Sequence, residues 1–84
     1  MTLDEAKEII NRFAHMHPKS IKVLQEFSAY VACARQVIEV GRKENKTNAE
    51  ILNDESLEVY VRKMVDVLFT LEEHGEIPKI IPAK

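Results

Sequence analysis

Three histidines are the residues of this 84-residue sequence best suited to bind a metal ion. His15 and His17 stand two positions apart in "HMH", and His74 lies far along the chain. Two imidazoles at that spacing could share a metal on extended backbone, but a tetrahedral site needs further ligands about 2.0 to 2.3 Å from the metal. The sequence supplies no convincing third and fourth ligand. We therefore interpret His15 and His17 as residues of a corner between two helices, and we expect no metal or other cofactor.

One cysteine and two acidic pairs are the remaining candidates for catalysis. Cys33 precedes Arg35, a cation that could favour a reactive thiolate, but its position in an alanine-rich stretch favours burial and an inert thiol. The acidic pairs are Asp54 with Glu55 and Glu72 with Glu73. Each pair falls near a predicted helix end, so we interpret these acids as capping or solvated residues. The sequence therefore predicts a protein that is not an enzyme.

Composition narrows the remaining functions. Twelve basic and fourteen acidic residues are interspersed and leave a net charge of −2, which disfavours broad attraction to nucleic acid or an anionic membrane. A single cysteine predicts a reducing compartment, so we expect a cytoplasmic protein. No apolar run approaches the roughly 20 residues that a membrane span needs. The two glycines are too far apart for the usual phosphate-binding loops.

Helical periodicity predicts an all-α fold. Thr2 and Glu5 form a capping-box pattern that starts a first helix, which should end near "HMHP" because the residue before a proline avoids the α region. A second, long helix is predicted from Pro18 to about Asn45, where apolar residues recur at steps of three and four. Polar residues near 44–48 predict a loop after it.

A third helix is predicted over residues 48–74, opened by a second capping-box pattern at Thr47 and Glu50. The segment "LNDES" could interrupt this helix, because its polar side chains compete for backbone hydrogen bonds. We therefore expect a short turn of helix there, followed by the main segment. Gly75 suits the left-handed residue that often follows a helix, and Pro78 prevents the helix from continuing.

The predicted organisation is one helical domain over residues 1–75, followed by an extended tail over 76–84. The tail should dock partly through its isoleucines, Ile77, Ile80 and Ile81. Helices two and three, each about 40 Å long at 1.5 Å per residue, should form a long antiparallel hairpin. The short first helix, about 20 Å long, would cover only half of that hairpin. Residues 58–75, "EVYVRKMVDVLFTLEEHG", would then keep an uncovered apolar face.

Such a face is larger than a soluble monomer normally exposes, and its burial at about 25 cal/mol per Å² favours association. Most small oligomers are symmetric dimers, so we expect a second hairpin to complete a dimeric helical bundle. The small residues of "SAYVACA", 28–34, mark the expected closest contact, although alanine also simply favours helix. The interface candidates are Ser28, Ala29, Ala32, Cys33, Tyr60, Met64, Phe69 and Ile80.

Three classes of function fit these observations. The first is a small, non-enzymatic protein-interaction module, such as an adaptor, inhibitor or regulatory protein, that acts as a homodimer on a further protein. The second is a dimeric nucleic-acid-binding regulator with Arg42, Lys43 and Lys46 on phosphates, which the mixed charges disfavour. An immunity or anti-host protein of bacterial or phage origin is the third, because such proteins share the size and helical character. An enzyme or metal protein built on the three histidines is a further alternative and the weakest.

Overall fold

A computed structural model describes the backbone of residues 1–16 and 21–82, and the side chains of residues 1–12 and 28–82. These residues form four helices and no strand: α1 (Leu3–Met16), α2 (Ile21–Lys43), α3 (Asn48–Leu52) and α4 (Val59–Glu73). The predicted all-α class is therefore confirmed. Among the described residues, no helix combines the length and the apolar character needed to span a membrane.

Two helix starts follow the local signals in the sequence. The N–H of Glu50 donates to Thr47 Oγ1 at 3.2 Å, and the N–H of Thr47 donates to Glu50 Oε1 at 3.2 Å, so the predicted capping box is complete. At α1 the N–H of Glu5 donates to Thr2 Oγ1, while the Thr2 hydroxyl donates to the Glu5 carboxylate. The predicted restart at Pro18 lies outside the described residues.

The predicted third helix is interrupted, so the described residues form four helices where three were expected. The Asp54 carboxylate accepts hydrogen bonds from the N–H and the hydroxyl of Ser56, which holds a turn between α3 and α4. Glu58 then caps α4, because its carboxylate accepts from the N–H groups of Tyr60 and Val61. Polar side chains of the "LNDES" region therefore bond to the backbone and end the helix, as predicted.

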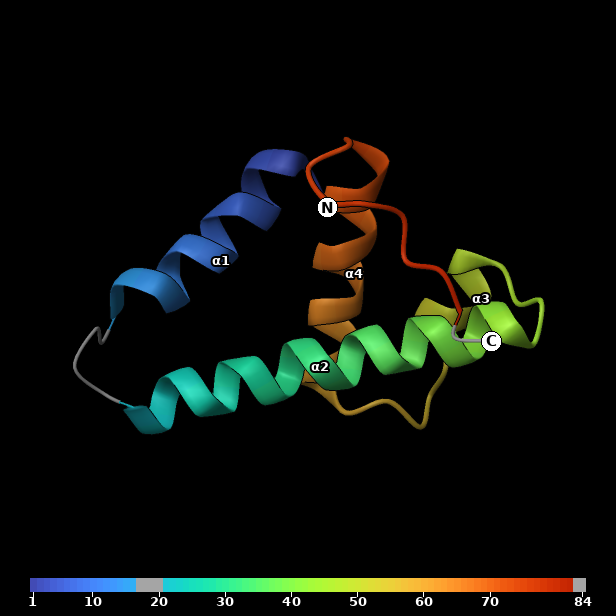
Figure 1. Ribbon diagram of the computed structural model, residues 1–84, viewed down its shortest axis with the longest axis horizontal. Helices are drawn as coiled ribbons and strands as arrows, with labels where there is room; N and C mark the ends of the chain where they lie inside the picture. Colours follow the sequence, from blue (N-terminus) through green and yellow to red (C-terminus); the bar gives the residue numbers. More distant parts are fainter. Residues whose placement is uncertain (17–20, 83–84) are drawn as a thin grey trace.

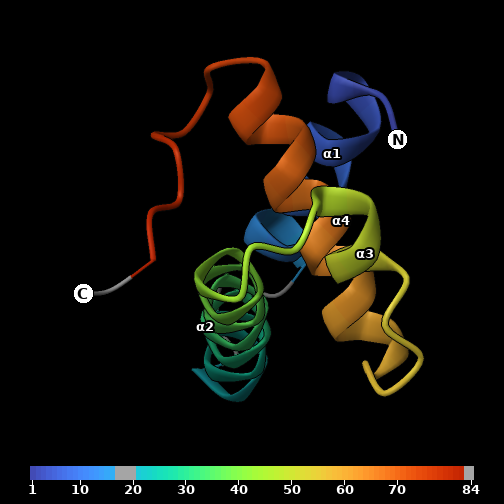
Figure 2. The same cartoon turned by 90° about the vertical axis from the view of Figure 1, so that its right-hand side faces the viewer.

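The expected long antiparallel hairpin is not present. Figure 1 shows α4 crossing α2 steeply, and Figure 2, which views α2 end-on, shows the same crossing. At 15 residues α4 is also short, about 22 Å at 1.5 Å per residue. The hairpin is absent because the helix is interrupted at Asp54, and the connection over 53–58 allows α4 to begin in a new direction. The steep crossing leaves room for α1 and α3 to pack against α4 as well.

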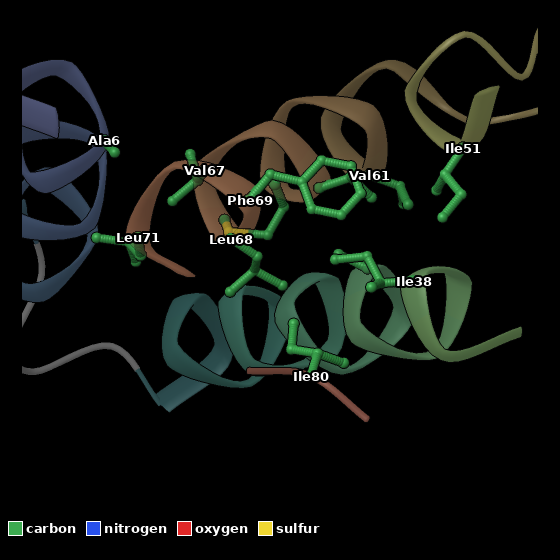
Figure 3. Close-up of a cluster of buried hydrophobic side chains, with 12 residues drawn as sticks. Ala6, Ile38, Ile51, Val61, Val67, Leu68, Phe69, Leu71 and Ile80 are labelled. Atoms are coloured by element: carbon green, nitrogen blue, oxygen red, sulfur yellow. The ribbon is translucent and has the colours of Figure 1, made fainter. Parts of the chain in front are cut away.

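The apolar face predicted to remain uncovered on α4 is therefore buried within the chain. Figure 3 shows Ile38 of α2 pointing toward α4, Ile51 of α3 pointing toward α2, and Ala6 of α1 at the other end of α4. The buried apolar side chains of α4 are Val61, Met64, Val65, Val67, Leu68, Phe69 and Leu71. Thr70 is also buried, and its hydroxyl donates to the Asp66 carbonyl at 2.9 Å.

The C-terminal tail begins at a left-handed glycine, as predicted. Gly75 has φ +70°, its N–H donates to the Glu72 carbonyl, and the N–H of Glu76 donates to the Leu71 carbonyl. This pair of bonds is the Schellman ending of a helix. Beyond it residues 76–82 form neither helix nor strand and run back toward the C-terminal half of α2 (Figure 1).

Docking of the tail depends mainly on one side chain. Ile80 is 4% exposed and belongs to the central apolar cluster, and Ile77 is half-buried against it. The expectation for Ile81 is wrong, because that side chain is 71% exposed. Neighbouring residues of an extended segment point in opposite directions, so burial of Ile80 turns Ile81 outward.

The contact between α2 and α3 requires glycine at position 41. A Cβ on Gly41 would lie 2.5 Å from Ile51 Cγ1 and 2.7 Å from its Cδ1. We expect Gly41→Ala to lower the free energy of unfolding by about 1–2 kcal/mol, because overpacking outweighs the better helix propensity of alanine. Urea unfolding followed by circular dichroism measures it. Gln36→Ala, at an exposed position of the same helix, is the matched control and should change stability by less than about 0.5 kcal/mol. A gain of stability for Gly41→Ala would contradict this account of the contact.

Candidate functional site

The end of α2, the end of α4 and the tail meet at a cluster of polar groups. Arg42 Nη1 donates to Glu72 Oε2 at 2.7 Å, and Arg42 Nη2 donates to Glu72 Oε1 at 2.6 Å, which makes the pair bidentate. Arg42 Nη1 also donates to the carbonyl of Ile80 at 2.7 Å, and the N–H of Ile80 donates to Glu72 Oε2 at 2.8 Å. We call this arrangement of Arg42 and Glu72 around the backbone of Ile80 the clamp.

Two further contacts hold the guanidinium of Arg42. Its Nη2 donates to Asn48 Oδ1 at 3.1 Å, at the start of α3, and its Cζ lies 5.5 Å from the centroid of the Phe69 ring. The second geometry is that of a cation–π contact. The guanidinium therefore contacts groups from α3, α4 and the tail at once.

The clamp is largely shielded from solvent, and its hydrogen bonds shift the pKa values of both side chains. The side chains of Arg42 and Glu72 are only 14% and 11% exposed. Hydrogen bonds from Arg42 hold the pKa of Glu72 below its ordinary value, although burial opposes this, and the N–H of Ile80 adds to the lowering. The hydrogen bond to Glu72 raises the pKa of Arg42. An acid in the last turn of a helix opposes the helix dipole, so the charge of Glu72 needs the cation beside it.

A second feature lies on the outer side of α2. Ala29, Cys33, Gln36 and Val40 follow at steps of four, three and four, which places them on one face of the helix. All four are exposed, and the side chain of Val40 is 49% exposed. We call these four residues the outer face of α2.

A groove of about 330 Å³ runs beside this face, between α2 and the chain that connects α3 to α4. It is lined by Cys33, Gln36, Val37, Val40, Gly41, Glu44, Lys46, Ile51, Asp54, Ser56 and Leu57. Tyr30 on α2 and Tyr60 on α4 pack with ring centroids 5.8 Å apart, and Tyr60 remains 60% exposed. Tyr30 is half-buried against the core, so Tyr60 is the exposed member of this pair, at the start of α4.

The predicted interface residues fall into two groups. Ser28, Ala29, Ala32, Cys33 and Tyr60 are exposed. The other three, Met64, Phe69 and Ile80, are buried in the chain's own core and present no surface to a partner. The sequence pattern could not separate these groups, because it did not reveal that α1, α3 and the tail also cover the apolar faces of α4 and its neighbours.

The predicted burial of Cys33 is wrong. The residue is exposed, because Ala34 and Ile38 are the residues of this part of α2 that point into the core. An alanine-rich sequence does not specify which side of the helix is covered. Cys33 instead lies at the middle of the outer face, where it also lines the groove.

Of the three cations assigned to phosphate contacts, Lys43 is exposed and the other two lie beside carboxylates. Arg42 is engaged in the clamp, and Lys46 Nζ lies 3.2 Å from the Glu44 carboxylate. The interpretation of Glu72 as a capping or solvated acid is likewise corrected, because its carboxylate is buried against Arg42. The sequence gives no local signal for this pair, whose partners stand 30 residues apart.

The histidines are placed only in part. His74 follows the end of α4, and its Nδ1 lies 2.9 Å from the Thr70 carbonyl. His17 and the side chain of His15 lie outside the described residues. Within the part of the chain that the structure describes, no three histidine, cysteine or acidic side chains gather closely enough to hold a metal ion.

Comparison with models of protein families, with curated proteins and with solved structures finds no match to this chain. The functional assignment therefore depends on the chemistry of the clamp, the outer face of α2 and the groove.

Removal of the Arg42 side-chain charge should destabilise the protein strongly. We expect Arg42→Met to lower the free energy of unfolding by about 2–3 kcal/mol, because Glu72 would stay buried without its cation. Arg35→Met is the matched control, since the Arg35–Glu39 pair is an exposed i,i+4 pair on the same helix and is worth about 0.5 kcal/mol or less. Urea unfolding at neutral pH measures both. Equal effects of the two variants would contradict a special role of the clamp.

The clamp should also make stability depend on pH on the acid side. The folded-state pKa of Glu72 lies below its ordinary value of 4.5, so its contribution is present above that pH and is lost as pH falls through the folded pKa. We expect Glu72→Gln to be less stable than wild type at pH 7, and the difference to shrink below about pH 4.5. Urea unfolding from pH 7 to pH 3 measures the difference, with Glu55→Gln as the exposed-acid control. A difference that stays constant with pH would contradict the prediction.

Proposed function

We propose that the protein is a small, non-enzymatic interaction module that binds another protein through the outer face of α2 and the adjoining groove, with a second copy of the chain as a partner. The exposed stripe on α2 is the observation that carries this proposal. Ala29, Cys33 and Val40 place apolar side chains in solvent on one helix face, with Gln36 between them. Apolar stripes of this kind on a small helical protein are typical of helix-mediated association.

Two features support close approach by a second helix. Ala29 and Cys33 are small and four residues apart, so another backbone can come near at that level. In an antiparallel pair of α2 helices with a two-fold axis near Gln36, Cys33 would face Val40 of the second copy. A small side chain would then meet a larger one at both ends of the contact, which suits complementary packing.

The groove adds surface to that contact. It opens beside Cys33 and Val40, and the start of α4 offers further exposed apolar side chains at Tyr60 and Val59, the latter 72% exposed. Tyrosine provides a large contact area at a low cost in conformational entropy. This arrangement differs from the expected bundle, because the contact would centre on α2 instead of on a hairpin of α2 and α4.

The proposal can be tested by placing a charge on the outer face. We expect the wild-type mass to approach twice 9.7 kDa with rising concentration below the millimolar range, and Val40→Lys to remain near 9.7 kDa over that range, because a buried charge without a partner opposes association. Light scattering across a concentration series measures it. Asn11→Lys puts the same charge on an exposed position of α1 and should leave the wild-type behaviour intact. A wild-type protein that stays monomeric to millimolar concentration would reject the second copy as a partner, and unchanged dimerisation of Val40→Lys would reject the outer face.

A further inference from the structure

The tail is held mainly at one residue, Ile80. Its side chain enters the apolar core, its N–H donates to Glu72, and its carbonyl accepts from Arg42. The residues on either side of it, Lys79 and Ile81, are both exposed. The protein therefore binds one residue of an extended chain at three points. The clamp bonds its backbone N–H and its backbone carbonyl, and the apolar core packs against its aliphatic side chain.

None of these contacts depends on the covalent connection between the tail and α4. The same backbone and side-chain groups are offered by the tail of any other copy of this chain. Recognition of an extended segment through main-chain hydrogen bonds, with a pocket for one side chain, is a general mode of peptide binding. Here the ligand is already present as residues 76–82.

The connection to α4 is suited to a change of direction. Gly75 has φ +70°, which other residues rarely adopt, and no atom lies within 4 Å of where its Cβ would be. Between Gly75 and Ile80, the side chains of Glu76, Pro78 and Lys79 are exposed, and Ile77 is half-buried. The ion pair of Glu76 with Lys7 is itself exposed and adds little. Release of the tail therefore requires mainly that Ile80 leave the clamp.

We propose that the clamp is a peptide-binding site and that copies of the protein exchange tails, so that Ile80 of one copy binds between Arg42 and Glu72 of another. Exchange of an identical element adds no new type of contact, which makes it a low-cost route to a dimer. The attached tail has an effective concentration in the millimolar range. The population of the exchanged form should therefore rise at high protein concentration, or where a chain's own tail binds its clamp poorly. This contact is separate from the outer face of α2 and does not require it.

A full-length Ile80→Ala chain tests whether the clamp binds a tail in trans. The probe is the blocked peptide of residues 76–82, added at up to about 1 mM, the range of the attached tail. We expect it to raise the midpoint of thermal unfolding of this variant, because a ligand that binds only the folded state stabilises it. If the variant is partly unfolded at 25 °C, the peptide should restore its helical circular dichroism. No response in either measurement would overturn the proposal.

Two altered peptides test whether binding depends on the side chain of Ile80. A peptide with Ile80→Ala should bind at least about tenfold more weakly, whereas a peptide with Ile81→Ala should bind as well as the original, since that side chain is exposed. Combining Arg42→Met with Ile80→Ala in the receptor chain should abolish the response. Equal binding of the two altered peptides would overturn the proposal.

Mixing two full-length variants tests the exchange itself. One chain carries Ile80→Ala and keeps the clamp, and the other carries Arg42→Met and keeps the tail; both also carry Val40→Lys, so that the outer face of α2 cannot contribute. We expect sedimentation of the mixture at high concentration to show a species near twice the mass of one chain, and each variant alone to stay monomeric. A mixture that remains monomeric although the peptide binds would overturn tail exchange.

Discussion

The guanidinium of Arg42 is the point at which the separate segments of this fold are joined. It stands on α2 and contacts a carboxylate of α4, an amide oxygen at the start of α3, a carbonyl of the tail and the ring of Phe69. Glu72 lies in the last turn of α4, where the helix dipole disfavours an acid, and its side chain is only 11% exposed. The geometry of the clamp therefore requires that α2, α4 and the tail be placed together, and it links tail docking to global stability.

The steep crossing of α2 and α4 decides which surfaces remain for other molecules. In the expected antiparallel hairpin, with α4 aligned along α2, half of the apolar face would have stayed uncovered. The steep crossing instead allows α1, α3 and Ile80 of the tail to complete the burial of α4 and its surroundings. Small domains bury a limited fraction of their surface. Among the side chains that the structure describes, most of the buried apolar ones belong to α4. Helix α2 is longer than its neighbours can cover, so its apolar surplus appears at Ala29, Cys33 and Val40.

Local signals were sufficient for helix ends and insufficient for helix placement. The Thr47 capping box, the interruption near Asp54 and the left-handed Gly75 were predictable, because each depends on bonds within a few residues. The burial of Thr70, the exposure of Cys33 and the Arg42–Glu72 pair were not, because each depends on which helix lies opposite. Arg42 and Ile80 are 38 residues apart in the sequence, and the type of one residue does not predict a contact with the other. Helical periodicity predicts the width of each apolar face, but it does not predict which helix packs against that face.

Both candidate binding regions depend on the same end of α2. Asn48 and Ile51 hold α3 against Arg42 and Gly41, and this contact fixes one wall of the groove that borders Val40. Groups held in place before binding lose less conformational freedom when a partner arrives, which favours affinity. Loss of Arg42 should therefore loosen the groove as well as the tail, although the two lie on different sides of the helix. The clamp thus stabilises the fold and also keeps the surface of α2 ordered for association.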